Sequence, residues 1–334
     1  MLANSPPLPL VIYYLDARRD ITAEDEKGLF LALKQPNRIR CIRIKWSLHR
    51  LEEFVEAIDH ELPFLEYLVI MATEEDRIPT FVPTFVFSEI IQAPRLRHLV
   101  LVRIAPKGSR LLTTAVGLVT LCLYMDYSSD YIKPVSDSST FINPDSLLHW
   151  ISPLSQLETL EITTYPNRRV ETQVEMLLSH TLAITPNLRM LSFKGVSAYL
   201  DVLISQITMP RLETLCVTLL VERTISIPCL VRFVNAAENE RLRFDSAKFE
   251  FSNNELRLVT YPHEKNRGCS FSISVDCRSF SQNIFHMSHI VYDMLGQAFS
   301  TVEHLTLDLV GLENGLSYGT NFSCRVGRID WYKL

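Results

Sequence analysis

Glycine is scarce in this chain, with 10 residues among 334. Phosphate-cradling loops and glycine-dependent nucleotide folds need glycines at fixed spacings, so this scarcity argues against both. Neither sign of charge dominates, because a formal net charge of -5 gives no general attraction to nucleic acid. No stretch approaches the roughly 20 uninterrupted apolar residues of a membrane-spanning helix. These shortages argue against several classes of function, but they do not indicate which function the chain has.

The seven cysteines contain no Cys-x-x-Cys pair and are dispersed along the chain. That arrangement predicts free thiols in a reducing compartment. Residues 1–9 contain three prolines and no basic segment, so we interpret them as a linker or N-terminal tail and not as a signal peptide. Together these features predict a cytoplasmic or nuclear protein.

The sequence is rich in one repeated pattern, L-x-x-L-x-L, of which residues 188–193 are a clear copy. The distance between successive copies varies from 22 residues (118 minus 96) to 39 residues (157 minus 118). Four copies have a proline two residues before the first apolar position, which suits a tight entry into a short strand. Further copies start at Ile39, Leu65, Leu96, Leu118, Leu157 and Leu212, and degenerate copies start at Phe244 and Val302.

Helical periodicity between the copies predicts a strand and a helix in each repeat. One such pair cannot bury its own apolar face, whereas stacked neighbours share a continuous core. We therefore predict one right-handed α/β solenoid of the leucine-rich-repeat type over residues 10–334, with parallel strands on its concave face and helices outside. We expect this solenoid to be irregular near its C-terminus. The individual predictions are a buried strand at 10–15, helices at 23–35, 171–184, 198–207, 227–237 and 280–299, a loop insertion at 127–143 and a hairpin at 255–277.

Residues beside the second and third apolar positions of each copy should point away from the helices, because side chains alternate along a strand. Early in the array these positions form an apolar and partly aromatic patch, which is typical of the centre of a protein interface. The alternative is that other segments cover the patch as ordinary core. The candidate partner-binding residues on this face are Arg43, Lys45, Tyr67, Met71, His98, Val100, Val102, Tyr124 and Glu161.

Arg38, Arg40, Arg43 and Lys45 make one strand basic. Such a strand could receive an acidic or phosphorylated peptide through charge-assisted hydrogen bonds. Alternatively, the alternating charges protect a solvated edge strand from aggregation. Acidic residues follow directly in the next segment, which argues against nucleic-acid binding.

No catalytic motif is recognisable. The sequence contains no G-x-S-x-G, G-x-x-x-x-G-K or H-E-x-x-H, and no nucleophile has a base in a recognisable local arrangement. His286 and His289 have a spacing that can bind metal, but they lack acidic or cysteine partners at ligand spacing. We therefore expect no catalytic residue, no metal site and no cofactor, although an enzyme whose site is dispersed over the array stays an alternative.

These residues resemble a known family. The proline-preceded repeats, the segment 6–10 leading into a strand, the hairpin between Leu256 and Asp276 and the closing Asp330-Trp331 are together similar to the leucine-rich-repeat region of F-box proteins of mushroom-forming fungi. The resemblance covers about residues 6–334. It implies a non-enzymatic module that recognises the substrate of an F-box type ubiquitin ligase.

Two features depart from that family. The sequence has no counterpart of the F-box, the N-terminal helical segment that docks a Skp-type adaptor, because strand-like sequence begins almost at once. It also lacks the asparagine that follows the last leucine of common leucine-rich repeats. We therefore expect a protein substrate or partner, and the adaptor only where an F-box lies upstream. The alternative function is an incomplete or remnant gene product with a structural scaffold and no ligase role.

Overall fold

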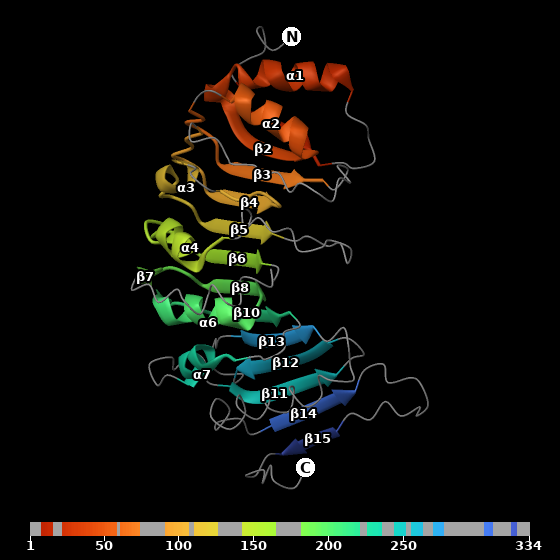
Figure 1. Cartoon of the computed structure of the whole chain (residues 1–334), viewed down its shortest axis with the longest axis vertical. Helices are drawn as coiled ribbons and strands as arrows, with labels where there is room; N and C mark the ends of the chain where they lie inside the picture. The colour runs from red at the N-terminus through yellow and green to blue at the C-terminus, as the bar shows by residue number, and fades with distance from the viewer. Residues whose placement is uncertain are drawn as a thin grey trace. The chain divides into compact units, whose positions relative to one another are not determined.

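A computed structural model describes residues 8–15, 22–58, 61–73, 91–106, 110–125, 142–164, 182–220, 226–235, 244–251, 255–262, 270–276, 304–309 and 322–325. The chain divides into two compact units, which we call unit 1 (1–164 and 181–188) and unit 2 (165–180 and 189–334). Each unit combines helices with strands; the strand pairings are parallel in unit 1 and both parallel and antiparallel in unit 2 (Figure 1). The predicted mixed α/β class is therefore confirmed.

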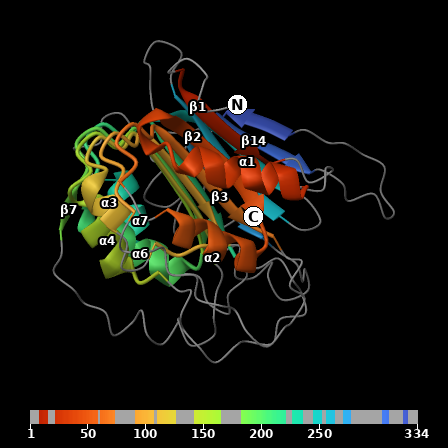
Figure 2. The ribbon, with the colours of Figure 1, turned by 90° about the horizontal axis from the view of Figure 1, so that it is seen from above.

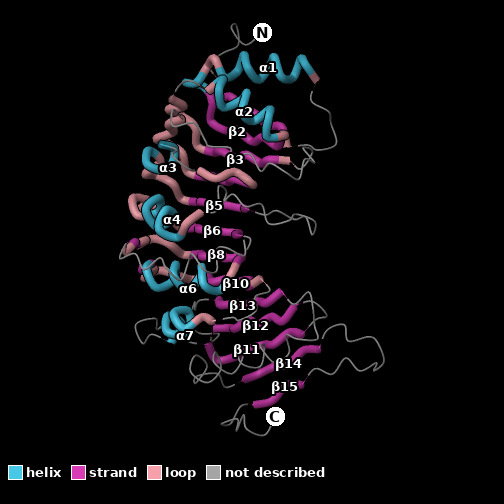
Figure 3. Tube along the Cα trace, in the orientation of Figure 1, coloured by secondary structure: helices cyan, strands magenta, loops and turns pink. Residues whose placement is uncertain are grey.

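The first six strands of unit 1 form a parallel sheet in which neighbours in space are also neighbours in the chain order of strands. Turns and helices connect them (Figure 3), because parallel strands need a crossover connection. The elements of unit 1 are β1 (Leu10–Tyr14), α1 (Ala23–Leu33), the 3-10 turn η2 (Pro36–Arg38), β2 (Ile39–Trp46), α2 (Leu48–Ala57), β3 (Tyr67–Ala72), β4 (His98–Val102), α3 (Arg110–Thr114), β5 (Thr120–Met125), α4 (Pro144–Ile151), β6 (Thr159–Thr164) and β7 (Ala183–Ile184).

A tight turn before the strands explains the prolines of the repeat. The backbone N–H of Leu65 donates to the carbonyl of Leu62, which closes a β-turn with Pro63 at its second position. Proline is favoured there because its φ is already near the required value. The same hydrogen bond closes the turns 93–96, 185–188 and 209–212, again with proline second.

The three apolar residues of each repeat have separate positions in the structure. In the copy that starts at Leu65, this residue is fully buried at the end of the turn, two residues before the strand. Leu68 and Ile70 are buried within β3, whereas Tyr67 beside them is 44% exposed. Seen from above, α2, α3 and α4 lie on one face of the unit 1 sheet (Figure 2). The second and third apolar residues therefore fill the layer between strands and helices.

Local sequence signals begin the helices of unit 1. Thr22 caps α1 by accepting a hydrogen bond from the backbone N–H of Asp25, whose carboxylate bonds back to Thr22. This reciprocal pair satisfies backbone groups that the first turn leaves unpaired. Asn143 caps α4 by accepting a hydrogen bond from the backbone N–H of Asp145, and Pro144 follows at the first helical position, where its missing N–H costs nothing.

Unit 2 departs from a simple serial order of strands. β10 has β8 on one side and β13 on the other, both parallel to it. β12 is antiparallel to β13 and to β11, and β14 then pairs with β11 in parallel. The elements of unit 2 are β8 (Met190–Gly195), α6 (Ser197–Gln206), β9 (Ile207–Thr208), β10 (Thr214–Leu219), α7 (Pro228–Asn235), β11 (Phe244–Phe251), β12 (Glu255–Pro262), β13 (Ser270–Asp276), β14 (His304–Leu309) and β15 (Phe322–Arg325).

The expected hairpin corresponds to β12 and β13, whose antiparallel pairing sets Leu258 opposite Ile273. A second antiparallel pair, β11 with β12, was not expected, because β11 has the apolar pattern of a repeat copy. Its buried residues Ala247 and Phe249 keep that pattern. The direction of the neighbouring strand is therefore independent of the local pattern.

Two predicted elements need correction. The helix predicted at 171–184 is wrong at its end, because Ala183 and Ile184 form the short strand β7. The residue before Pro186 is biased towards extended backbone, which disfavours a helix reaching this point. The strand predicted at 10–15 exists as β1, but it is not buried on both faces, since Val11 and Tyr13 are 65% and 57% exposed.

Other predictions fall on residues that the structure does not describe. These are the first part of the 171–184 helix, the 280–299 helix with His286 and His289, and nearly all of the 127–143 insertion. The helix predicted at 198–207 is confirmed as α6. The helix predicted at 227–237 corresponds to α7, which ends at Asn235.

The burial pattern predicts unequal effects of truncating two neighbours in β4. Leu101 is fully buried against the helix layer, whereas Val102 on the other face is partly exposed. We expect Leu101→Ala to lower the free energy of unfolding by about 2–5 kcal/mol, and Val102→Ala by about 1 kcal/mol or less. Urea titration followed by circular dichroism measures both. Equal losses would contradict the assignment of the two faces.

Candidate protein-binding face

The face of the unit 1 sheet opposite the helices, which we call the open face, carries three rows of side chains. Equivalent positions line up because the strands pair in register, about 4.8 Å apart. All nine candidate residues named above belong to these rows. Row 1 is Val11, Cys41, Tyr67, His98, Thr120 and Thr159; row 2 is Tyr13, Arg43, Val69, Val100, Cys122 and Glu161; row 3 is Lys45, Met71, Val102, Tyr124 and Thr163.

Apolar side chains occupy the middle of rows 2 and 3. We call Val69, Met71, Val100, Val102 and Cys122 the apolar centre. Val69 and Cys122 are only 5% and 6% exposed, although among the described residues no helix covers this face. The apolar centre is thus a continuous surface that already excludes much of the water from its middle.

Row 1 contains a stacked pair beside the apolar centre. The rings of Tyr67 and His98 lie 4.2 Å apart, centroid to centroid, and are nearly parallel at 11°. Nδ1 of His98 is 3.1 Å from the hydroxyl oxygen of Thr120. Burial, and then the positive charge of Arg97, lower the pKa of His98. The imidazole is therefore neutral at pH 7, and the stack presents no cation beside the apolar centre.

An acidic residue lies at the β6 end of the open face. The hydroxyl of Tyr124 donates a hydrogen bond to the carboxylate of Glu161. Burial and this hydrogen bond raise the pKa of Tyr124. Burial and the negative charge of Glu161 raise the pKa of Cys122 to about 11. Phenol and thiol are both protonated at neutral pH, and a protonated thiol is a weak nucleophile.

Basic residues lie at the β2 end, but the four of the predicted basic strand do not act together. Arg43 lies over the ring of Tyr13 at 5.8 Å, and Lys45 is half-buried in row 3. Arg38 instead donates to Gln35 and to the carbonyl of Leu8. Arg40 forms an ion pair with Glu66 at 2.9 Å. Only the second half of the basic run belongs to the open face.

Sequence reasoning missed two aromatic residues. Tyr13 joins row 2 from the edge strand β1, but the continuous apolar run of that strand gives no sign of which side chains face outward. Phe64 lies between two guanidinium groups, with Arg40 at 4.8 Å and Arg95 at 4.7 Å from its ring. Phe64 follows the turn proline, so the repeat pattern marks its place but not its partners.

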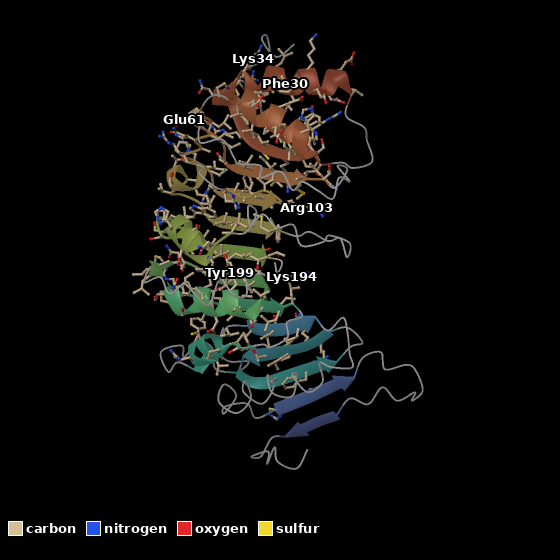
Figure 4. All side chains as sticks on the ribbon, viewed as in Figure 1. Phe30, Lys34, Glu61, Arg103, Lys194 and Tyr199 are labelled. Carbon is tan, nitrogen blue, oxygen red and sulfur yellow. The ribbon has the colours of Figure 1, made fainter. Side chains whose placement is uncertain are left out.

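The chain turns away from the sheet directly after β4. Arg103 has a φ of 62°, in the left-handed region that side chains with a Cβ seldom adopt. Its backbone N–H donates to the carbonyl of Tyr124 at 2.7 Å. Figure 4 labels Arg103 beyond the carboxyl end of β4. This turn ends β4 beside Tyr124, the residue that bonds to Glu161.

The neutral state of His98 predicts a pH-dependent stability. Its folded pKa lies below the unfolded value of about 6.5, so as pH falls the unfolded state binds the proton first. The contribution of neutral His98 to the free energy of unfolding is complete above pH ~6.5. It is lost as pH falls through the lower pKa that His98 has in the folded state. We expect His98→Phe, which keeps a ring against Tyr67, to lose less stability than the wild type between pH 7.5 and 5.5. Identical losses in urea titrations would contradict this.

The raised pKa of Cys122 predicts slow reaction with thiol reagents. At pH 8 a thiol with a pKa of about 11 is ionised in roughly one molecule in a thousand. We expect Cys122 to react with iodoacetamide at least about tenfold more slowly than the less buried Cys216 of unit 2. Peptide mass spectrometry of the native chain measures this, with the urea-unfolded chain as the control in which both react alike. Equal native rates would refute the assignment.

Neither a family model nor a curated protein nor a solved structure matches this chain. In the part of the chain that the structure describes, no helix is long and apolar enough to cross a membrane. The same described residues include no group of three His, Cys, Asp or Glu that could hold a metal ion. The interpretation of the open face therefore rests on its own geometry.

Proposed function

We propose that the open face of unit 1 binds a protein partner, and that the chain acts by binding and not by catalysis. The apolar centre is the observation that carries this proposal. Valine, methionine and cysteine side chains are continuous there over three strands, with Tyr67 and Tyr124 beside them, and the described residues place no helix on them. Interface centres are similarly enriched in aromatic residues and methionine and depleted of charge.

The ionisation states on this face support binding over chemistry. Cys122 and Tyr124 are two groups on this face that could act as nucleophile or acid; both are protonated at neutral pH, and burial raises the pKa of each still further. Catalytic groups are usually shifted towards the operating pH, whereas these are shifted away from it. An enzyme with its site elsewhere in the chain is the alternative from another class.

We further propose that the repeats form a right-handed solenoid of the leucine-rich-repeat type. Its support is the turn, buried leucine and parallel strand that return in the same order through β6. A solenoid of this type presents its strands as an extended binding surface. In this reading the open face is the concave face.

The resemblance to the repeat region of fungal F-box proteins suggests the biological role. On that basis the partner is the substrate of an F-box type ubiquitin ligase, and a Skp-type adaptor binds only where an F-box lies upstream. The alternative is a remnant gene product in which the repeat is a structural scaffold with no ligase role. A partner whose binding requires the open face would favour substrate recognition over the remnant.

The test is a pull-down from cell extract with the chain as bait. We expect Tyr67→Ala and Tyr124→Ala each to reduce recovery of the partner at least about tenfold, because truncating an aromatic residue at an interface centre commonly costs 2 kcal/mol or more. Thr214→Ala, on the sheet of unit 2, should bind as the wild type does. Thermal unfolding of all variants checks that the fold persists.

The same bait with an F-box fused ahead of Pro6 tests the ligase role. Recovery of the Skp-type adaptor with the fusion alone, together with a second protein that both baits retain, would support substrate recognition. Full recovery of that second protein by both tyrosine variants would place the binding site elsewhere. Absence of any partner from both baits would favour the remnant.

A further inference from the structure

Charge on the open face is confined to its two ends. Among the described residues of the three rows, the charged side chains are Arg43 and Lys45 in β2 and Glu161 in β6. Within the described part of the chain no carboxylate lies at ion-pair distance from Arg43 or Lys45. Glu161 accepts from Tyr124 with one oxygen, and its second oxygen keeps acceptor capacity. The two ends therefore offer opposite charges to an occupant.

The backbone of the sheet restricts the conformation of that occupant. The strands from β2 to β5 are paired on both sides, so their N–H and C=O groups are used within the sheet. An extended peptide lying across them would press its own backbone polar groups against valine and methionine without partners. A helix satisfies these groups internally and offers an apolar stripe. The apolar centre therefore favours a helix.

The spacing of the charges sets the length of the helix. From β2 to β6 there are four strand intervals, or roughly 19 Å at about 4.8 Å each. A helix rises 1.5 Å per residue, so about 13 residues span this distance. Positions i, i+3 or i+4 and i+7 rise about 10.5 Å along a helix, which matches the roughly 10 Å from β3 to β5, so an apolar stripe at these positions would lie over β3, β4 and β5. The flanking charges then fall about one turn beyond the stripe.

We infer that the partner segment is an amphipathic helix that lies across the strands of the open face. Its apolar stripe packs on the apolar centre, an acidic residue at one end pairs with Arg43 and Lys45, and a basic residue at the other end pairs with Glu161. This inference rests on the proposed function and adds the conformation and the charge order of the occupant. The opposite end charges also set its direction across the face.

The test is a selection of random 16-residue displayed peptides on the immobilised full chain. We expect the enriched peptides to carry apolar residues at helical spacing, an acidic residue at one end and a basic residue at the other. Selection on the double variant Arg43→Glu, Lys45→Glu should replace the acidic residue by a basic one. The matched control is Lys194→Glu in β8 of unit 2 (Figure 4), which should leave the enriched pattern unchanged.

One enriched peptide, labelled and measured by fluorescence anisotropy, gives the size of the effect. We expect the double variant to weaken its binding at least about tenfold, and a peptide with lysine in place of the acidic residue to restore it. Circular dichroism of each variant checks the fold. Enriched peptides with alternating apolar residues, or with no charge preference, would overturn the inference and leave the proposed function standing. No enrichment on the wild type, or enrichment that Val100→Asp does not reduce, would count against the proposed function itself.

Discussion

The structure of unit 1 depends on a row of leucines that are fully buried just before successive strands. Leu96, Leu118 and Leu157 each end a tight turn and have no exposed surface. Because each turn holds its leucine in the layer between sheet and helices, the strand that follows begins at the same place in every repeat. The register of the sheet, and hence the three rows of the open face, follows from this burial.

The helix layer decides which residues remain for binding. Since one set of alternate side chains is used in the core, the other set must face away from it. In unit 1 this second set contains valine, methionine and aromatic residues, with charge at the two ends. In unit 2 the equivalent positions of β10 and β13 carry hydroxyl groups that bond to each other, such as Ser274 to Thr218 at 3.0 Å. The same backbone pattern thus supports two faces of different chemistry.

Much of this arrangement could be predicted from the sequence, because it depends on neighbours along the chain. The apolar spacing identified the strands of unit 1 and the side of each strand, and the prolines marked the turns. The pattern could not show that Val11 and Tyr13 belong to an edge strand, since both faces of β1 are apolar. The pattern also could not separate two groups of basic residues. Arg38 and Arg40 each bind other residues at the start of β2, whereas Arg43 and Lys45 lie on the open face.

Strand starts, the alternation of side chains and the candidate binding residues follow from the amino-acid order alone, because they reflect the geometry of a few consecutive residues. The order of β11, β12 and β13 depends on the folded chain, since strand pairing joins residues far apart in the sequence. The contacts that control ionisation also depend on the folded chain. Glu161 reaches Tyr124 across 37 residues of sequence, and no local pattern specifies which carboxylate a half-buried phenol will meet.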